Sequence, residues 1–250
     1  MSRILERGNL FFFFFYRPRV ETDRVDDLGD VQRFFLVLEP DGARRFRRLV
    51  VGRKRLPDPS ERERTWAFVA EVAKRPEELQ DELERKVYET KTRGTRVQPE
   101  ARPAGEARYA IVDHEGHTHI AYALELPRRR GEVQKALRIE REGSFIAAVR
   151  NPDAPAPRGT GLPSRERAEF PKRLAETFRG RRFAPLNPPD FLDYEGAEIV
   201  LIGAAEDAGR ELGIDFDTQR ERLDTADLVR DLRLRIGRDV PAEPLKGRWA

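Results

Sequence analysis

Seven consecutive large apolar residues, Leu10–Tyr16, constrain the fold of this 250-residue chain more than any other stretch. The run is too short to span a bilayer, which takes about 20 residues. An apolar run without alternation is typical of a strand covered on both faces, so Asn9–Arg17 is predicted to be a central strand. Arg-Pro-Arg follows where a signal peptide would carry small residues, which argues against an export signal and favours a cytoplasmic protein.

Two more strands and a helix are expected next. Val31–Leu38 and Phe46–Lys54 are β-prone and are separated by the turn signal Pro40-Asp41-Gly42, so an antiparallel meander is predicted. Ser60 and Glu63 have the spacing of a helix capping box. An apolar i, i+3, i+4, i+7 stripe follows and predicts a helix. The stripe consists of Trp66, Val69, Ala70 and Ala73.

The rest of the chain alternates between short helices and strands. Helices are predicted over Glu77–Glu84, Val133–Leu137, Ser164–Phe178, Glu206–Leu212 and Asp217–Arg235, and strands over Val87–Arg96, Ser144–Arg150 and Glu198–Ile202. We therefore expect an α+β fold in which helices pack on one face of mostly antiparallel sheets. After the last predicted helix, the chain ends in a tail with Trp249 as a docking anchor.

The proline- and glycine-rich segment Gln98–Gly105 is the best candidate for a linker. It would separate an N-terminal half (1–98) from a central half (106–215), followed by a helical C-terminal extension (216–250); one continuous domain is the alternative. Both halves offer a β-β-β-α-β order, and Pro59-Ser60 resembles Pro163-Ser164. An internal duplication is one hypothesis, and chance similarity within an ordinary α+β chain is the other.

Composition excludes several kinds of chemistry. The chain has no cysteine, so disulfides, thiolate zinc sites, iron–sulfur clusters and a cysteine nucleophile are ruled out. It also lacks the glycine-rich nucleotide-binding motifs and the serine-hydrolase elbow. The 48 basic and 45 acidic residues give a net charge of only +3, which does not by itself indicate nucleic acid.

The only three histidines of the chain lie in Tyr109–Pro127, which is predicted to be a β-hairpin with its turn at Asp113–Gly116. Alternation places Ile120, Tyr122 and Leu124 toward the core and the histidines on the opposite, wetter face. Imidazoles two apart on a strand can share a divalent metal. The candidate ligands are Asp113, His114, His117 and His119; the alternative is a solvated hairpin tip.

Arginines interleave with aromatic residues in three places, near Tyr16, Phe46 and Phe178. Guanidinium groups bind phosphate while aromatic faces stack on unpaired bases. Because the segment Arg44–Arg48 would carry arginine on both faces of a strand, that strand is predicted to lie at a sheet edge or to project from the fold. The candidate contacts are Arg17, Arg19, Arg45, Arg47, Arg53, Lys54, Arg55, Arg179, Arg181 and Arg182.

The leading functional hypothesis is a binding protein that contacts RNA, DNA or another acidic partner through these surfaces. Surface ion pairing with the many carboxylates is the competing explanation for the arginines. The second hypothesis is a metal-dependent enzyme built at the Asp113–His119 turn. The third is a structural or regulatory interaction protein, including a homo-oligomer, without chemistry of its own.

Overall fold

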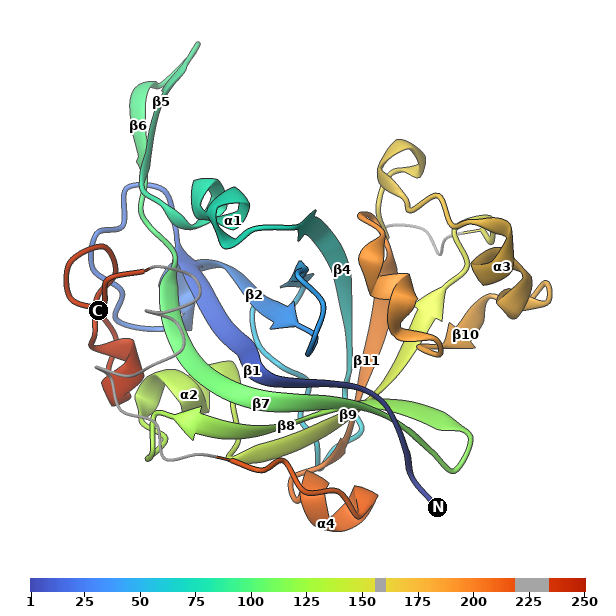
Figure 1. The fold of residues 1–250 in the computed structure, drawn as a ribbon. Coiled ribbons are helices and arrows are strands. Elements are labelled where there is room, and N and C mark those ends of the chain that lie inside the picture. Colours follow the sequence, from blue (N-terminus) through green and yellow to red (C-terminus); the bar gives the residue numbers. More distant parts are fainter. Residues whose placement is uncertain (156–160, 219–233) are drawn as a thin grey trace.

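The computed structural model describes residues 1–155, 161–218 and 234–250 (Figure 1). Its main feature is an antiparallel sheet that closes on itself in the order β9-β11-β4-β3-β2-β1-β7-β8, with β8 pairing back onto β9. The result is an eight-stranded barrel. Its strands are β1 (Arg3–Pro18), β2 (Val31–Glu39), β3 (Phe46–Val51), β4 (Arg64–Ala73), β7 (Arg102–His114), β8 (His117–Leu126), β9 (Glu142–Arg150) and β11 (Glu198–Ala205).

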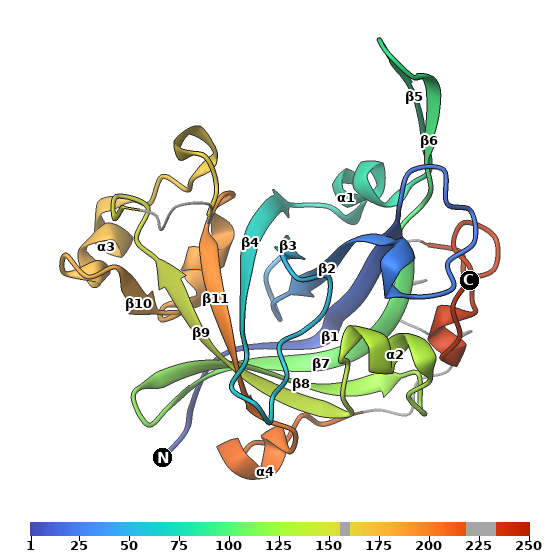
Figure 2. The ribbon, with the colours of Figure 1, turned by 180° about the vertical axis from the view of Figure 1, so that it is seen from behind.

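The predicted α+β fold is wrong, because the described residues are 41% strand and only 17% helical. A barrel buries the inner faces of its strands against one another, so no helical layer is needed to cover them. The α-helices of the described chain are short and scattered over the outside of the barrel (Figures 1 and 2). They are α1 (Pro76–Leu83), α2 (Glu132–Leu137), α3 (Lys172–Ala175) and α4 (Ala208–Leu212).

The largest local error concerns the helix predicted after Ser60, which is strand β4 and lies between β3 and β11. Thr65, Ala67 and Val69 are buried at every second position, and the residues between them are half-buried. Such alternation is the strand pattern, and it coincides here with a helical spacing. The β-branched and aromatic content of the segment favours the strand.

Aromatic rings fill the barrel. Phe12, Phe14 and Tyr122 are at most 1% exposed, and Phe14 lies 5.1 Å from Tyr122 and 6.4 Å from Phe34, centroid to centroid. Tyr122 continues the chain of contacts to Phe145, at 6.1 Å. Eight strands enclose a space just wide enough for side chains, and here these rings occupy it.

Strand β1 is buried on both faces, as its continuous apolar run predicts. Phe12 and Phe14 point into the barrel, whereas Phe13 and Phe15 belong to a second core outside it. Leu79 and Leu83 of α1 and residues of the C-terminal segment, including Leu245, complete that second core. The strand is also central, between β2 and β7.

The predicted single strand Val87–Arg96 is two strands, β5 (Lys86–Thr90) and β6 (Gly94–Gln98), which form a separate two-stranded ribbon. We call Lys86–Gln98 the arm. In both views the arm extends away from the barrel, and no described element lies beside its distal half (Figures 1 and 2).

The proposed linker does not separate two sheets. Ala101–Gly105 is buried, and β7 begins at Arg102 and pairs with β1. Strands from 1–98 and from 106–215 therefore share one barrel, and their element orders differ: β1 to β4 precede α1, whereas α2 separates β8 from β9.

The remaining C-terminal predictions have mixed outcomes. The segment Ser164–Phe178 forms only short pieces, namely η2 (Ser164–Glu166), α3 and η3 (Glu176–Phe178). Most of the helix predicted over Asp217–Arg235 lies outside the described residues. Trp249 does dock on the barrel, with its ring 5.3 Å from that of Tyr16.

Within the described ranges, no helix is long and apolar enough to cross a membrane.

Candidate functional site

A buried ionic cluster lies between β1, β3 and the segment that precedes β11. The Arg47 side chain is 3% exposed and donates to both carboxylate oxygens of Glu6, at 2.7 and 2.8 Å, and to Asp193 at 2.8 Å. The Tyr109 hydroxyl donates to Glu6 at 2.8 Å, and Arg45 also pairs with Asp193. Strand β3 pairs with β2 on one side and with β4 on the other, so the prediction that it lies at an edge or projects from the fold is wrong. An arginine is tolerated there because Glu6 and Asp193 neutralise it.

The electrostatics of this cluster favour its charged form. Burial opposes the charge on Arg47, but Glu6 and then Tyr109 and Asp193 outweigh it, so the pKa of Arg47 is raised. Burial, followed by the charge of Glu6, raises the pKa of Tyr109 well above its ordinary value, so the phenol stays protonated. The donors of Arg47 are engaged, and the cluster ties η4 (Pro189–Asp193) to the barrel.

Most candidate arginines in the first two clusters are engaged within the protein. Arg17 is buried and donates to the carbonyl oxygens of Glu82 and Glu84. Arg53 pairs with Glu63 at 2.6 Å, and Lys54 donates to the carbonyl oxygen of Val31 at 2.5 Å. Arg55 is half-buried, while Arg19 is exposed.

The third cluster keeps its arginines on the surface. Arg179, Arg181 and Arg182 are exposed, but Phe178 is 1% exposed and packs in the core. The rings next to the other two clusters, Tyr16 and Phe46, are also buried. Tyr16, Phe46 and Phe178 are therefore unavailable for stacking on a base, and Phe183, which follows Arg182, is half-buried against Trp66.

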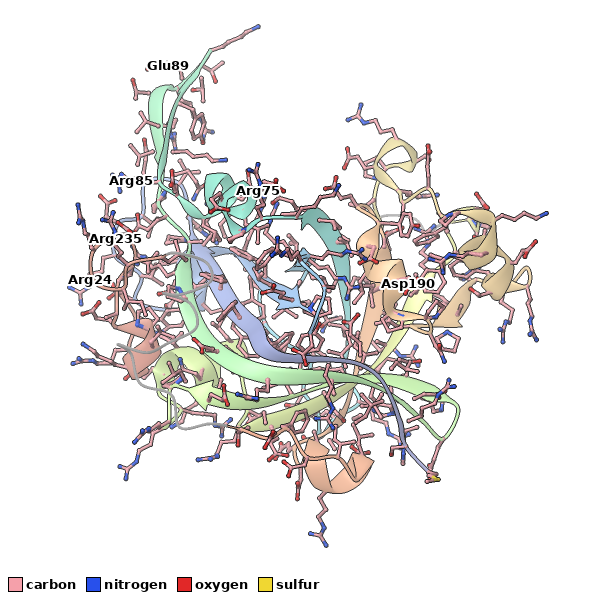
Figure 3. The ribbon with its side chains drawn as sticks, viewed as in Figure 1. Arg24, Arg75, Arg85, Glu89, Asp190 and Arg235 are labelled. Carbon is pink, nitrogen blue, oxygen red and sulfur yellow. The ribbon has the colours of Figure 1, made fainter. Side chains whose placement is uncertain are left out.

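The arm combines an exposed ring with two exposed cations, Lys91 and Arg93, whereas its other two cations pair with carboxylates: Lys86 with Glu82 and Arg96 with Glu21. Tyr88 is 41% exposed, and it is the only aromatic residue among the exposed large hydrophobic residues of the described chain. Register pairs Tyr88 with Arg96 and Lys86 with Gln98, so Lys86, Tyr88 and Arg96 share one face. Figure 3 shows Glu89 far out on the arm and Arg85 at its base. Sequence reasoning missed the arm because a ribbon that leaves the fold has the same alternation as a half-exposed strand.

The predicted hairpin is present, and its turn has Glu115 and Gly116 at φ values of 49° and 80°, as a tight two-residue turn requires. His117 is exposed, whereas His119 is only 4% exposed, so His119 does not lie on the wetter face that the alternation predicts for it. A cluster containing Ala208 and Leu212 of α4 packs on this face of β7 and β8. Asp113 points to the opposite face, where Arg3 and Asn187 donate to it.

The histidines are close but do not surround one point. The rings of His114 and His119 are 5.9 Å apart, and Ser2 Oγ lies 2.9 Å from His114 Nδ1. Burial, with smaller contributions from His114 and His117, lowers the pKa of His119 to about 4. Across residues 1–155, 161–218 and 234–250, no three His, Asp or Glu side chains stand ready to hold a metal ion.

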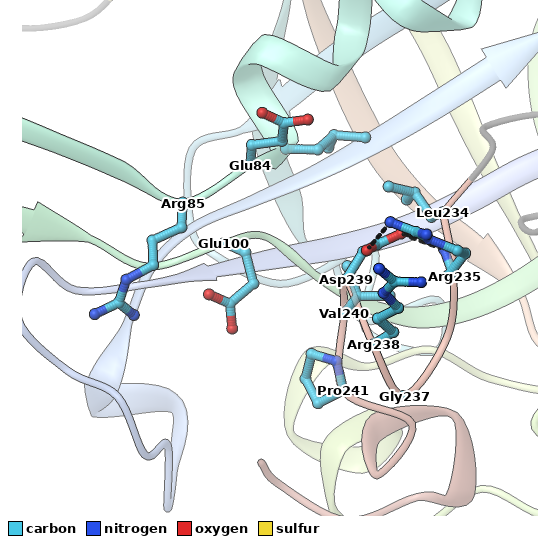
Figure 4. Close-up of a pocket in the computed structure, with 11 residues that line it drawn as sticks. Glu84, Arg85, Glu100, Leu234, Arg235, Gly237, Arg238, Asp239, Val240 and Pro241 are labelled. Atoms are coloured by element: carbon cyan, nitrogen blue, oxygen red, sulfur yellow. Dashed lines mark hydrogen bonds and ion pairs between the residues drawn. The ribbon is translucent and has the colours of Figure 1, made fainter.

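A pocket of about 760 Å³ lies between the base of the arm and the C-terminal segment (Figure 4). Glu84, Arg85 and Glu100 line one side, and Leu234, Arg235 and residues 237–241 line the other. Arg235 forms two hydrogen bonds with Asp239, at 2.7 and 2.8 Å, across its own turn. The lining carries both acidic and basic side chains, and Arg235 is already paired with Asp239. The pocket therefore does not indicate a particular class of ligand.

Comparison with known proteins gives no family for the chain: no family model, no curated protein and no solved structure matches it.

Proposed function

We propose that this protein binds single-stranded nucleic acid through the distal part of the arm, where Tyr88, Lys91 and Arg93 are exposed. The observation that supports the proposal is a ribbon that is anchored at its base and exposes the ring of Tyr88 and the cations Lys91 and Arg93 beyond the barrel. Aromatic rings occupy the barrel interior and leave little space for a ligand inside it, so a binding surface is expected on the outside of the molecule.

The base of the arm is held on both strands. Buried Arg17 binds the carbonyl oxygens of Glu82 and Glu84, at the end of α1 and just before β5. Gln98 Nε2 donates to the carbonyl oxygen of Pro18 at 2.8 Å, and Glu21 N–H donates to that of Val97 at 2.8 Å. These contacts fix the direction of the arm, so its distal face is presented in a defined orientation.

The chemistry of the exposed face suits an unpaired, stacked strand. The arm carries four cations and one carboxylate, that of Glu89. Lys86 pairs with Glu82 at 2.8 Å and Arg96 pairs with Glu21 at 3.0 Å, so Lys91 and Arg93 are the cations that a ligand can reach. Lys91 and Arg93 lie in the exposed turn, and no carboxylate in the described part of the chain forms an ion pair with them. Cations along a ribbon can follow phosphates while a tyrosine stacks on a base. An acidic protein would use the same cations but would not need the ring.

The test is fluorescence anisotropy with a labelled single-stranded oligonucleotide. Tyr88→Ala should weaken binding about 5- to 150-fold, since one base stacked on an aromatic ring contributes roughly 1–3 kcal/mol. The double variant Lys91→Glu/Arg93→Glu should abolish it. Binding by the parent protein should weaken as salt rises from about 50 to 200 mM, because phosphate contacts release counterions.

The matched control is Arg179→Glu/Arg181→Glu, which reverses two exposed arginines away from the arm. It should bind within about twofold of the parent. If the control loses binding and the arm variants keep it, the interface lies at the third arginine cluster and the proposal is wrong. If charge reversal in the arm matters but Tyr88→Ala does not, an acidic partner recognised by charge alone replaces the nucleic acid.

A further inference from the structure

The histidines of the chain gather on one outer face of the β7–β8 hairpin. His114 and His117 are the pair that closes the turn, and His119 follows on the same face as His117. Side chains directly opposite on antiparallel strands have Cβ atoms about 4.5–5.5 Å apart. The three imidazoles are therefore neighbours in space, independently of the arm.

His119 carries a buried nitrogen that nothing in the fold uses. The residue is 4% exposed, and its Nδ1 has no hydrogen-bond partner in the described part of the chain. Leaving a buried polar atom unpaired costs about 1–3 kcal/mol. A ligand that accepts the lone pair of this nitrogen would remove that cost.

Hydrogen bonding to Ser2 sets the tautomer of His114. The Ser2 hydroxyl donates its proton to the carbonyl oxygen of Leu212. It can therefore only accept at its contact with His114, 2.9 Å away, so Nδ1 of His114 carries the proton. The lone pair of His114 is then on Nε2. This is the arrangement found in metal sites, where the second ring nitrogen of a ligating histidine donates to a fixed acceptor.

The spacing of the two rings is close to that required for one shared ion. Two imidazoles that bind a tetrahedral zinc ion at roughly 2.0–2.1 Å hold their centroids roughly 5–5.5 Å apart. The centroids of His114 and His119 are 5.9 Å apart, so a small movement of either ring brings both onto one ion. His117 is exposed, so its side chain can change rotamer at little cost and complete the set.

We propose that this face binds a divalent transition metal of the zinc class through His114 Nε2, His119 Nδ1 and His117, with a fourth position open to solvent. Ser2 is a positioning residue, because it acts by orienting His114. Three imidazoles and an open position form the ligand set of catalytic zinc sites. Asp113, which the sequence offered as a ligand, is excluded because it faces the other side of the sheet.

The experiment uses untagged, chelator-treated protein titrated with zinc chloride by calorimetry. One zinc ion per chain should bind, with Kd below about 10 µM. His119→Gln and His114→Gln should weaken binding at least ~10-fold, and so should Ser2→Ala, as loss of such an orienting hydrogen bond does elsewhere. Asp113→Asn is the matched control and should bind zinc like the parent.

A second measurement separates ligation from simple loss of structure. Cobalt chloride added to the parent should give visible absorption bands typical of tetrahedral nitrogen coordination, and each histidine variant should weaken them while keeping the circular dichroism of the folded protein. Binding weaker than about 1 mM would overturn the proposal, because that affinity needs no built site. Unchanged binding by folded His119→Gln would overturn it as well.

Discussion

Arg47 is a charge enclosed by a barrel, and its two carboxylate partners make that position possible. Glu6 belongs to β1 and Asp193 to η4, so residues far apart in the chain neutralise it. A buried ion pair adds little stability over an apolar replacement of both partners, but breaking it by removing one partner is costly.

Replacing Arg47 with Met should therefore lower the free energy of unfolding by about 3–5 kcal/mol, because Glu6 and Asp193 lose their shared cation. Urea denaturation followed by tryptophan fluorescence measures this change. The matched control is Arg48→Met on the outer face of β3, where Arg48 pairs with Glu71 over the ring of Phe35. Equal losses for the two variants would contradict the role assigned to the cluster.

His119 should make the stability of the metal-free protein depend on pH. Its pKa is about 4 in the folded state and about 6.5 when unfolded, so the unfolded chain binds the proton more readily. The contribution of neutral His119 to the free energy of unfolding is therefore fully present above about pH 6.5. As the pH falls toward 4, the free energy of unfolding decreases by about 1–2 kcal/mol after allowance for solvent screening. Chemical denaturation at several pH values should show this decrease in the parent and in His117→Gln, but not in His119→Gln; the same slope in all three would exclude His119.

At the scale of elements, the sequence predicts strands well where apolar residues are dense. The run Leu10–Tyr16 indicates a strand buried on both faces, and β1 is one. The tight turn of the β7–β8 hairpin follows from Gly116. The prediction at β4 was wrong because Trp66–Ala70 is a continuous apolar run, and such a run contains residues at helical spacing as well as at strand spacing.

At the candidate site, residues that are neighbours in the sequence do not predict which side chains lie together on the surface. Alternation of arginine and aromatic residues predicts that both meet one ligand, yet Tyr16, Phe46 and Phe178 point into cores. In a strand, consecutive residues face opposite sides, so an arginine next to a buried ring is not beside it in space. Tyr88 and Arg96 are eight positions apart and share a face only because β5 and β6 pair.

At the scale of the whole molecule, the pairing of β8 with β9 decides whether the sheet is a barrel or an open sheet. Closure leaves β8 paired on both sides, with β7 and with β9. Amide hydrogens of Ile120–Ala123 and Glu142–Ile146 should therefore exchange with solvent as slowly as those of β1 and β7. Hydrogen exchange followed by mass spectrometry measures this, and rapid exchange confined to one edge of β8 would show an open sheet.

The separation of a closed barrel from a projecting arm is the central claim, and deletion of the arm tests it most directly. Lys86 and Gln98 are opposite each other, so an Asn-Gly turn can replace residues 87–97. The shortened protein should keep its fold, with Tm lowered by no more than about 4 °C, since it loses few buried contacts. Anisotropy titration should then show no binding of single-stranded nucleic acid; a folded, shortened protein that binds with the parent's affinity would contradict the account.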